Sequence, residues 1–294
     1  MASPRVRNLV NWVFAGLSLA CVGVVLIPLV SILYTALVNG GSVISVHFLT
    51  AGLPPALCQR TPGQSCPIGG IGPLIGGTLV LVALASAMAA PIGILVGVFT
   101  SEYGGYGLGK AVSFFTDVMT GLPSIVVGVF VYGLFVLYYP SIVFSAVTGS
   151  VALAIIMVPI VARTSEEALR AVPHAVREAA LGLGIPKYRG ILRVVLPSAG
   201  PAVATGALLA VMRAGGEAAP LLLTAFGNRF GFVGLNQPVG AIPPIIFEYG
   251  QAGPGSNWQA DAWGGALILI VLMLGISVVA RLVLRNRFRA FAGG

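Results

Sequence analysis

Six long apolar stretches dominate this sequence and limit the folds open to it. They cover residues 12–38, 71–99, 111–138, 142–162, 198–225 and 259–284. A helix that crosses a bilayer needs about 20 consecutive, mostly apolar residues, and each stretch reaches that length. Because lipid offers no hydrogen-bond partner to an open sheet edge or a lipid-facing loop, such stretches must be helical. The sequence therefore predicts an all-α membrane protein with about six transmembrane helices.

The composition fits a membrane environment along the whole chain. Of 294 residues, 57% are apolar and 8% are charged, whereas soluble domains carry about a quarter charged residues. No soluble domain or linker is visible, so we expect residues 1–294 to form a single transmembrane domain. Residues 39–70, rich in Gly and Pro, predict an irregular outer loop. Residues 226–258 predict a second outer segment, part of which dips back toward the bilayer.

The basic residues set the expected orientation. With both termini in the cytoplasm, thirteen of the sixteen Lys and Arg residues fall on the cytoplasmic side, as the positive-inside rule requires. These thirteen are Arg5, Arg7, Lys110, Arg163, Arg170, Arg177, Lys187, Arg189, Arg193, Arg281, Arg285, Arg287 and Arg289. Topology in a plasma or inner membrane therefore explains the net charge of +8, and no nucleic-acid partner is expected.

Residues 163–197 form the one long charged stretch between two apolar ones. Such a segment must lie at a membrane face, where a soluble partner can dock. Pro173 suits the first position of a helix and Gly184 the position after a helix end, which predicts a short helix between them. Pro186 predicts the start of a second short helix through Val195, which Pro197 is expected to break or kink before the next span. The alternative on charge alone is a solvated loop without a partner.

The spacing of small residues in this stretch favours a docking segment over a solvated loop. Glu178-Ala179-Ala180 precedes Gly184, and Val194 and Leu196-Pro197 follow it. This pattern resembles the EAA loop of ABC-importer permeases. The resemblance implies that the two short helices, joined at Gly184 as an elbow, fit into a cleft of a separate ATPase. Small residues would permit close approach, and Glu178 would pair with a basic ATPase residue. Ile185-Pro186 departs from the small or hydroxyl residues often found after the Gly, which affects local capping.

An ATP site on the chain itself is not expected. Gly104, Gly109 and Lys110 match most of the phosphate-cradle pattern G-x-x-x-x-G-K-[ST], but Ala111 replaces the hydroxyl that would ligate Mg²⁺. The segment also links two spanning stretches rather than a strand and a helix. No Cys or His spacing resembles a metal site. We therefore expect this chain to bind no cofactor, and ATP and Mg²⁺ to be bound by the partner ATPase.

Arg213 and Glu217 stand within the fifth apolar stretch. A charge at mid-membrane costs on the order of 2.5–3.5 kcal/mol on insertion scales. The i, i+4 spacing places both on one helix face. One interpretation is a structural ion pair, or an Arg that snorkels to an interface. The other is an anion site on a pathway, since a guanidinium holds oxyanions with forked hydrogen bonds.

The surrounding residues carry a second resemblance. They are Arg213-Ala214-Gly215-Gly216-Glu217-Ala218-Ala219-Pro220-Leu221-Leu222, with Gln237-Pro238, Ala241-Ile242-Pro243, Ile246-Phe247 and Ala262-Trp263-Gly264-Gly265-Ala266-Leu267 further on and Gly121-Leu122-Pro123-Ser124-Ile125-Val126 earlier. This set resembles PstA-type phosphate permeases over roughly residues 71–285. Ala218 replaces the usual Thr, so a hydroxyl contact would be absent. Sulfate and molybdate permeases share the Arg-Ala-x-Gly-Glu core but usually differ in the residues that follow.

Asp117 and two cysteines are further candidates. Asp117, near the cytoplasmic end of the third stretch, is a candidate gate partner for a basic residue. The favoured alternative is a hydrated carboxylate at the interface. Cys58 and Cys66 share the first outer loop and are candidates for a disulfide if that compartment oxidises thiols. Cys21 is expected to be an apolar filler.

The resemblance implies one permease half of a phosphate ABC importer. Its implied partners are a second permease of PstC type, two copies of a cytoplasmic ATPase, and an extracytoplasmic phosphate-binding protein. Arg213 and Glu217 would lie on the pathway, and Glu178, Ala179, Ala180, Gly184, Leu196 and Pro197 would couple to the ATPase. The chain itself would make or break no bond. The alternatives are another oxyanion importer, a secondary anion transporter that leaves the EAA spacing without a purpose, and an intramembrane hydrolase, for which no nucleophile and base constellation is present.

Overall fold

A computed structural model describes residues 4–53, 69–105, 107–225, 228, 231–252 and 257–292. Every regular element within these residues is helical, which confirms the predicted all-α class. The longer helices are α1 (Pro4–Thr35), α3 (Gly72–Tyr103), α4 (Gly107–Thr120), α5 (Ser124–Tyr138), α6 (Ala146–Arg170), α9 (Leu196–Gly215) and α12 (Asn257–Ala292). Among the described residues, five helices are long and apolar enough to cross a membrane, and a bent pair, α4 with α5, makes a sixth if it counts as one span.

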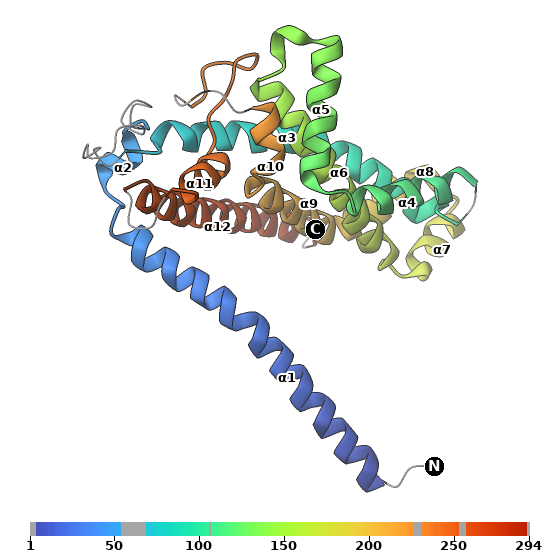
Figure 1. Ribbon diagram of the computed structural model, residues 1–294. Coiled ribbons are helices and arrows are strands. Elements are labelled where there is room, and N and C mark those ends of the chain that lie inside the picture. The colour runs from blue at the N-terminus through green and yellow to red at the C-terminus, as the bar shows by residue number, and fades with distance from the viewer. Residues whose placement is uncertain are drawn as a thin grey trace.

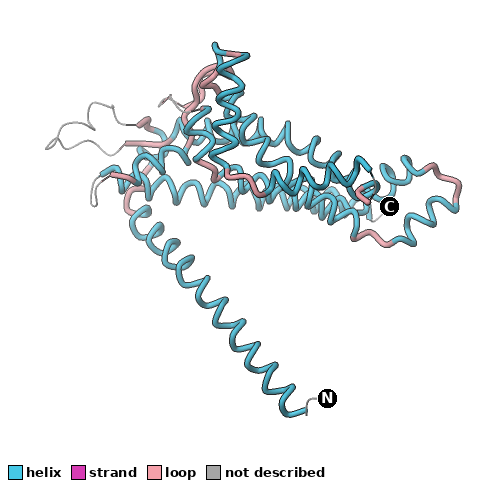
Figure 2. The backbone as a smooth tube through the Cα atoms, turned by 45° about the vertical axis from the view of Figure 1, so that its right-hand side comes forward, coloured by secondary structure: helices cyan, strands magenta, loops and turns pink. Residues whose placement is uncertain are grey.

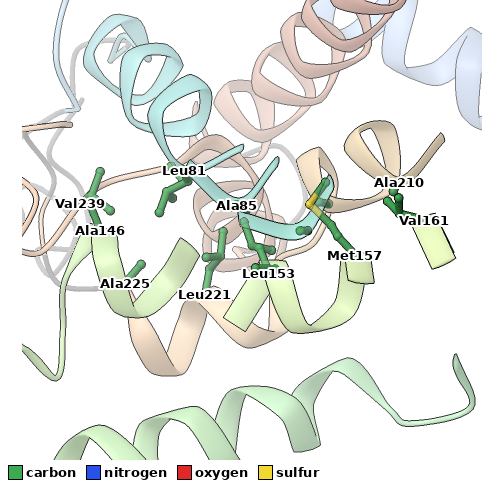
Figure 3. Close-up of a cluster of buried hydrophobic side chains, with 14 residues drawn as sticks. Leu81, Ala85, Ala146, Leu153, Met157, Val161, Ala210, Leu221, Ala225 and Val239 are labelled. Atoms are coloured by element: carbon green, nitrogen blue, oxygen red, sulfur yellow. The ribbon is translucent and has the colours of Figure 1, made fainter. Parts of the chain in front are cut away.

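Helices α3 and α6 form the centre of the molecule (Figure 1). They approach closely because glycines of α3 face α6: a Cβ on Gly93 would lie 2.6 Å from Cβ of Val161, and one on Gly97 would lie 2.6 Å from Cβ of Ser165. Apolar side chains from α3, α6, α9 and the short helix α10 (Ala219–Thr224) fill the core beside this contact (Figure 3). This packing makes α3 and α6 one rigid unit.

The predicted third span, residues 111–138, is wrong as a single helix. Helix α4 ends at Thr120, α5 begins at Ser124, and the two are bent by 106°. Pro123 explains the break, because it lacks an N–H and disfavours the α conformation of the preceding residue. Its carbonyl then accepts a hydrogen bond from the Val126 N–H at 3.0 Å and opens the new helix.

The predicted fifth span, 198–225, is also interrupted. Helix α9 ends at Gly215 and α10 starts at Ala219. Consecutive glycines weaken a helix at this point, and α10 turns to pack against α5, where a Cβ on Gly128 would lie 2.8 Å from Cα of Pro220. The break lies immediately beside Glu217.

The second outer segment contains a helix, α11 (Ile242–Gly250), which packs against α12. Its Tyr249 is fully buried and stacks on Trp258 with ring centroids 5.4 Å apart. The short helix α2 (Val46–Thr50) adds Phe48 to the same apolar cluster. This cluster closes the end of the molecule opposite the charged segment 163–197.

Helix α1 extends away from the other helices, as two views of the backbone show (Figures 1 and 2). Together with the π-helical turn Ala36–Gly40, α1 forms the apolar span Val10–Gly40. None of the 18 most apolar consecutive residues of this span is buried against the rest of the chain. Large side chains such as Trp12, Leu19 and Ile27 are more than two-thirds exposed. An apolar helix with this exposure is suited to lipid or to another membrane chain.

Candidate functional site

The charged segment 163–197 folds as a projecting elbow. Helix α6 ends at Arg170, and α7 (His174–Gly182) follows Pro173. Gly184 has φ +74°, a left-handed conformation that residues with a Cβ rarely adopt. The predicted helix start and the predicted turn at Gly184 are therefore both present. Figure 1 places the elbow at the end of the molecule that is far from α2 and α11.

Of the break or kink expected at Pro197, the break is absent, but the helix is distorted just before this residue. Helix α8 (Lys187–Gly190) leads through a π-helical stretch, Ile191–Val195, directly into α9. Pro197 lies in the first turn of α9, where its missing N–H costs little because the wider π-helical turns precede it. The second arm of the elbow is therefore continuous with a spanning helix.

The residues predicted to couple to an ATPase lie at the surface of this elbow, with one exception. Glu178, Ala179, Gly184 and Pro197 are exposed and Leu196 is half-buried. Ala180 is 7% exposed, and a Cβ on Gly190 of α8 would lie 3.7 Å from its Cβ. Ala180 therefore keeps α7 close to α8, while the other small residues form a surface that a partner can approach.

Sequence reasoning missed a buried acid beneath the elbow. Glu102, at the end of α3, forms ion pairs with Arg177 of α7 and Lys187 of α8, each at 3.4 Å. Its side chain is 8% exposed. Its place at the end of an apolar stretch was a usable signal, but its partners come from distant parts of the sequence.

A second ionic network joins α4 to α6. Arg163 pairs with Asp117, donates to Glu166 at 2.9 Å and donates to Ser113 at 3.4 Å. Glu166, with a side chain 3% exposed, also pairs with Arg170 at 2.7 Å. Asp117 thus contacts a basic residue, as the gate hypothesis requires, while remaining 52% exposed. The contact itself is established, and its role as a gate stays a prediction.

Arg213 and Glu217 are brought together by the break after α9. Nε of Arg213 lies 3.5 Å from Oε1 of Glu217, and the two side chains are 58% and 17% exposed. Arg213 also lines a cavity of about 30 Å³ at the bend between α4 and α5, beside Thr120 and Ser124. A guanidinium, two hydroxyls and the first turn of α5 therefore gather at one point among apolar side chains.

The remaining candidates are the cysteines. Cys58 and Cys66 lie outside the described residues, and the disulfide stays a prediction; Cys21 is exposed on α1 and unpaired. Within the described part of the chain, no group of three or more His, Cys, Asp or Glu residues is placed to hold a metal ion.

Comparison with known proteins agrees with this architecture. Residues 89–289 match the family of binding-protein-dependent transport system inner membrane components. The phosphate transport system permease protein PstA of Xylella fastidiosa (strain 9a5c) is 42% identical over 221 residues, which cover 74% of this chain and 76% of that protein. PstA of Yersinia pestis is 35% identical over 282 residues, 96% of this chain and 92% of that protein.

Solved structures share the fold at low sequence identity. A bacterial alginate ABC transporter chain has a TM-score of 0.63 at 16% identity and covers 93% of this chain and 96% of its own. The MetNI methionine ABC transporter, in an inward-facing conformation, gives 0.60 at 20% identity over 73% of this chain and 95% of its own. With identities of 42% and 35% over most of its length, the chain belongs to the PstA family of phosphate transport system permeases, within the binding-protein-dependent inner membrane components.

Proposed function

We propose that this chain is one permease half of the channel of an ATP-driven importer of inorganic phosphate. The observation that supports phosphate as the substrate is Arg213, whose charged side chain is 58% exposed within an apolar span. Because such a charge is costly in lipid, its exposed part is expected to face a watery pathway or another protein chain. Its forked donors suit the oxygens of phosphate, and the relatives in Xylella fastidiosa and Yersinia pestis are named for phosphate transport.

Glu217 gives Arg213 a partner when no anion is present. The separation of 3.5 Å exceeds the 2.7–2.9 Å typical of a tight charge-assisted hydrogen bond, so an oxyanion competes with Glu217 for the guanidinium at modest cost. Glu217 also makes the local electrostatic potential more negative, which prevents the anion from binding too tightly to leave. The pair would therefore act as a binding point that releases its ligand.

The space beside Arg213 suggests where the pathway opens. A cavity of about 30 Å³ holds about one water molecule and is too small for a phosphate ion. Passage therefore requires that α9 move away from the α4–α5 bend, or that the ion pass along the exposed side of Arg213, where a second permease would complete the channel.

Energy would come from a partner. The exposed elbow, α7 with Gly184, would seat in a cytoplasmic ATPase present in two copies, which binds ATP and Mg²⁺; this chain would bind no cofactor and catalyse no reaction. A PstC-type permease and an extracytoplasmic phosphate-binding protein complete the proposed complex. Both termini and the elbow would then lie in the cytoplasm and the α2–α11 end outside, in the plasma or inner membrane.

Reconstitution of the complex in proteoliposomes tests this function. ATP is enclosed in vesicles whose ATPase faces the lumen, and labelled inorganic phosphate is supplied outside with the binding protein. Phosphate should then accumulate in the lumen, and excess sulfate or molybdate should not compete with it. Preference for sulfate or molybdate would support the other oxyanion importers instead. Uptake that is indifferent to ATP, with no ATPase in the purified complex, would support a secondary transporter and end the ABC assignment of mechanism.

A further inference from the structure

The charged groups beneath the elbow link it to α3, a helix that is not adjacent to it in the sequence. Glu102 lies one residue before the end of α3, where the helix dipole disfavours a carboxylate. Burial adds to that cost, since the side chain is 8% exposed. A buried carboxylate is retained where cations neutralise it, and here Arg177 and Lys187 do so.

The two cations come from opposite arms of the elbow. Arg177 belongs to α7 and Lys187 to α8, and Gly184 makes the turn between these helices. Arg177 also donates to the Leu169 carbonyl at 2.7 Å, near the end of α6. Lys187 Nζ lies 4.5 Å from the ring centroid of Tyr103, the last residue of α3. Arg177 thus fastens α7 to the ends of α3 and α6, and Lys187 fastens α8 to the end of α3.

We propose that Glu102 is a positioning residue for energy coupling: with Arg177 and Lys187 it forms a clamp through which the ATPase-driven movement of α7 is transmitted to α3. This role rests on the proposed function. In the sequence, the elbow directly follows α6 and leads into α9, whereas α4 and α5 stand between α3 and α6. Because α3 and α6 pack as one unit through Gly93 and Gly97, force applied at Glu102 moves the centre of the molecule and not the elbow alone.

The clamp is incompletely closed in this conformation. Both ion pairs measure 3.4 Å, longer than the 2.7–2.9 Å of a tight charge-assisted hydrogen bond. Within the described residues, Oε1 of Glu102 and Nε of Arg177 are buried without a hydrogen-bond partner. A cavity of about 210 Å³, lined by Glu102, Ala180 and Ile191 among others, lies between α7 and the π-helical stretch Ile191–Val195. Room and unused hydrogen-bonding groups are therefore both present for α7 to close toward α3.

The test measures coupling rather than activity alone. Glu102→Gln removes the charge and keeps the shape of the side chain. In the complete transporter, reconstituted with its ATPase, second permease and binding protein, the variant should assemble normally and hydrolyse ATP. The number of phosphate ions imported per ATP should fall, by on the order of fivefold or more for a coupling contact. Glu102→Asp keeps the charge, so its number of phosphate ions imported per ATP should lie between those of Glu102→Gln and the original protein.

Controls separate coupling from stability. Glu167→Gln removes an exposed carboxylate at the end of α6 and should leave the ratio unchanged. If Glu102→Gln leaves the number of phosphate ions imported per ATP unchanged, even where uptake and ATP hydrolysis both fall, the clamp has no coupling role and the proposal is wrong. Should Glu102→Gln fail to fold, Lys187→Gln, at a side chain 51% exposed, decides the question by the same ratio. A complete transporter without ATP-dependent phosphate uptake would remove the proposed function itself, and the clamp's role with it.

Discussion

Asp117 of α4 and Arg163 of α6 form an ion pair that fastens the bent third span to the central helices, with Nε of Arg163 donating to Oδ1 at 2.7 Å. Arg163 simultaneously neutralises Glu166, whose side chain is 3% exposed. One guanidinium therefore serves an exposed carboxylate and a buried one, and the two contacts differ in energetic weight.

Removing each partner should reveal that difference. Asp117→Asn should cost less than about 1 kcal/mol, since Asp117 is 52% exposed and exposed pairs contribute little. Arg163→Gln should cost more, up to about 3 kcal/mol, because it leaves the buried Glu166 with Arg170 as its remaining ion-pair partner. Thermal unfolding of the purified protein in detergent measures both. Equal shifts in midpoint would contradict the assignment of Glu166 as the costly group.

The proposed role of Arg213 in binding the anion depends on its geometry as well as its charge. Arg213→Lys keeps a cation but loses the planar fork that matches an oxyanion, so phosphate uptake should fall by on the order of ten- to a hundredfold for a contact worth 1.5–3 kcal/mol. Arg213→Ala should abolish uptake. Glu217→Gln removes the competitor of the anion, and phosphate should bind more tightly and leave more slowly. Initial uptake rates over a range of phosphate concentrations test all three.

Assembly provides the control for these variants. Because Arg213 is 58% exposed, neither of its substitutions should prevent recovery of the complete complex. Normal uptake by Arg213→Lys and Arg213→Ala would remove this residue from the pathway and leave the structural ion pair as its role.

The sequence predicted the helical class and local turns, because hydrophobic length, proline and glycine act locally. The turn at Gly184 is an example. The sequence did not reveal that Pro123 bends the third span by 106°, since prolines within α3 and α6 leave those helices continuous. It also did not reveal the partners of Glu102. Contacts between distant helices depend on packing, which no local pattern records.

The close approach of α3 and α6 predicts a sharp difference between two glycines of one helix. A Cβ on Gly97 would lie 2.6 Å from Cβ of Ser165, whereas one on Gly76 would meet nothing within 4 Å. Gly97→Ala should therefore destabilise the protein by about 1–3 kcal/mol through overpacking. Gly76→Ala should be neutral or stabilising, by up to about 1 kcal/mol. Unfolding midpoints that shift alike would show that α3 and α6 separate without cost.

The elbow offers a matched pair of glycines for the last prediction. Gly184 has φ +74°, and a residue with a Cβ pays about 1–2 kcal/mol there, so Gly184→Ala should turn α7 away from α8 and weaken association with the ATPase. Gly184→Asn should retain more association, because Asn tolerates the left-handed region. Gly182→Ala is the control: Gly182 ends α7 and a Cβ there would contact nothing within 4 Å. Recovery of the ATPase with the purified permease measures each variant. If Gly184→Ala retains the ATPase as well as Gly182→Ala does, the left-handed turn is not what presents α7 to its partner.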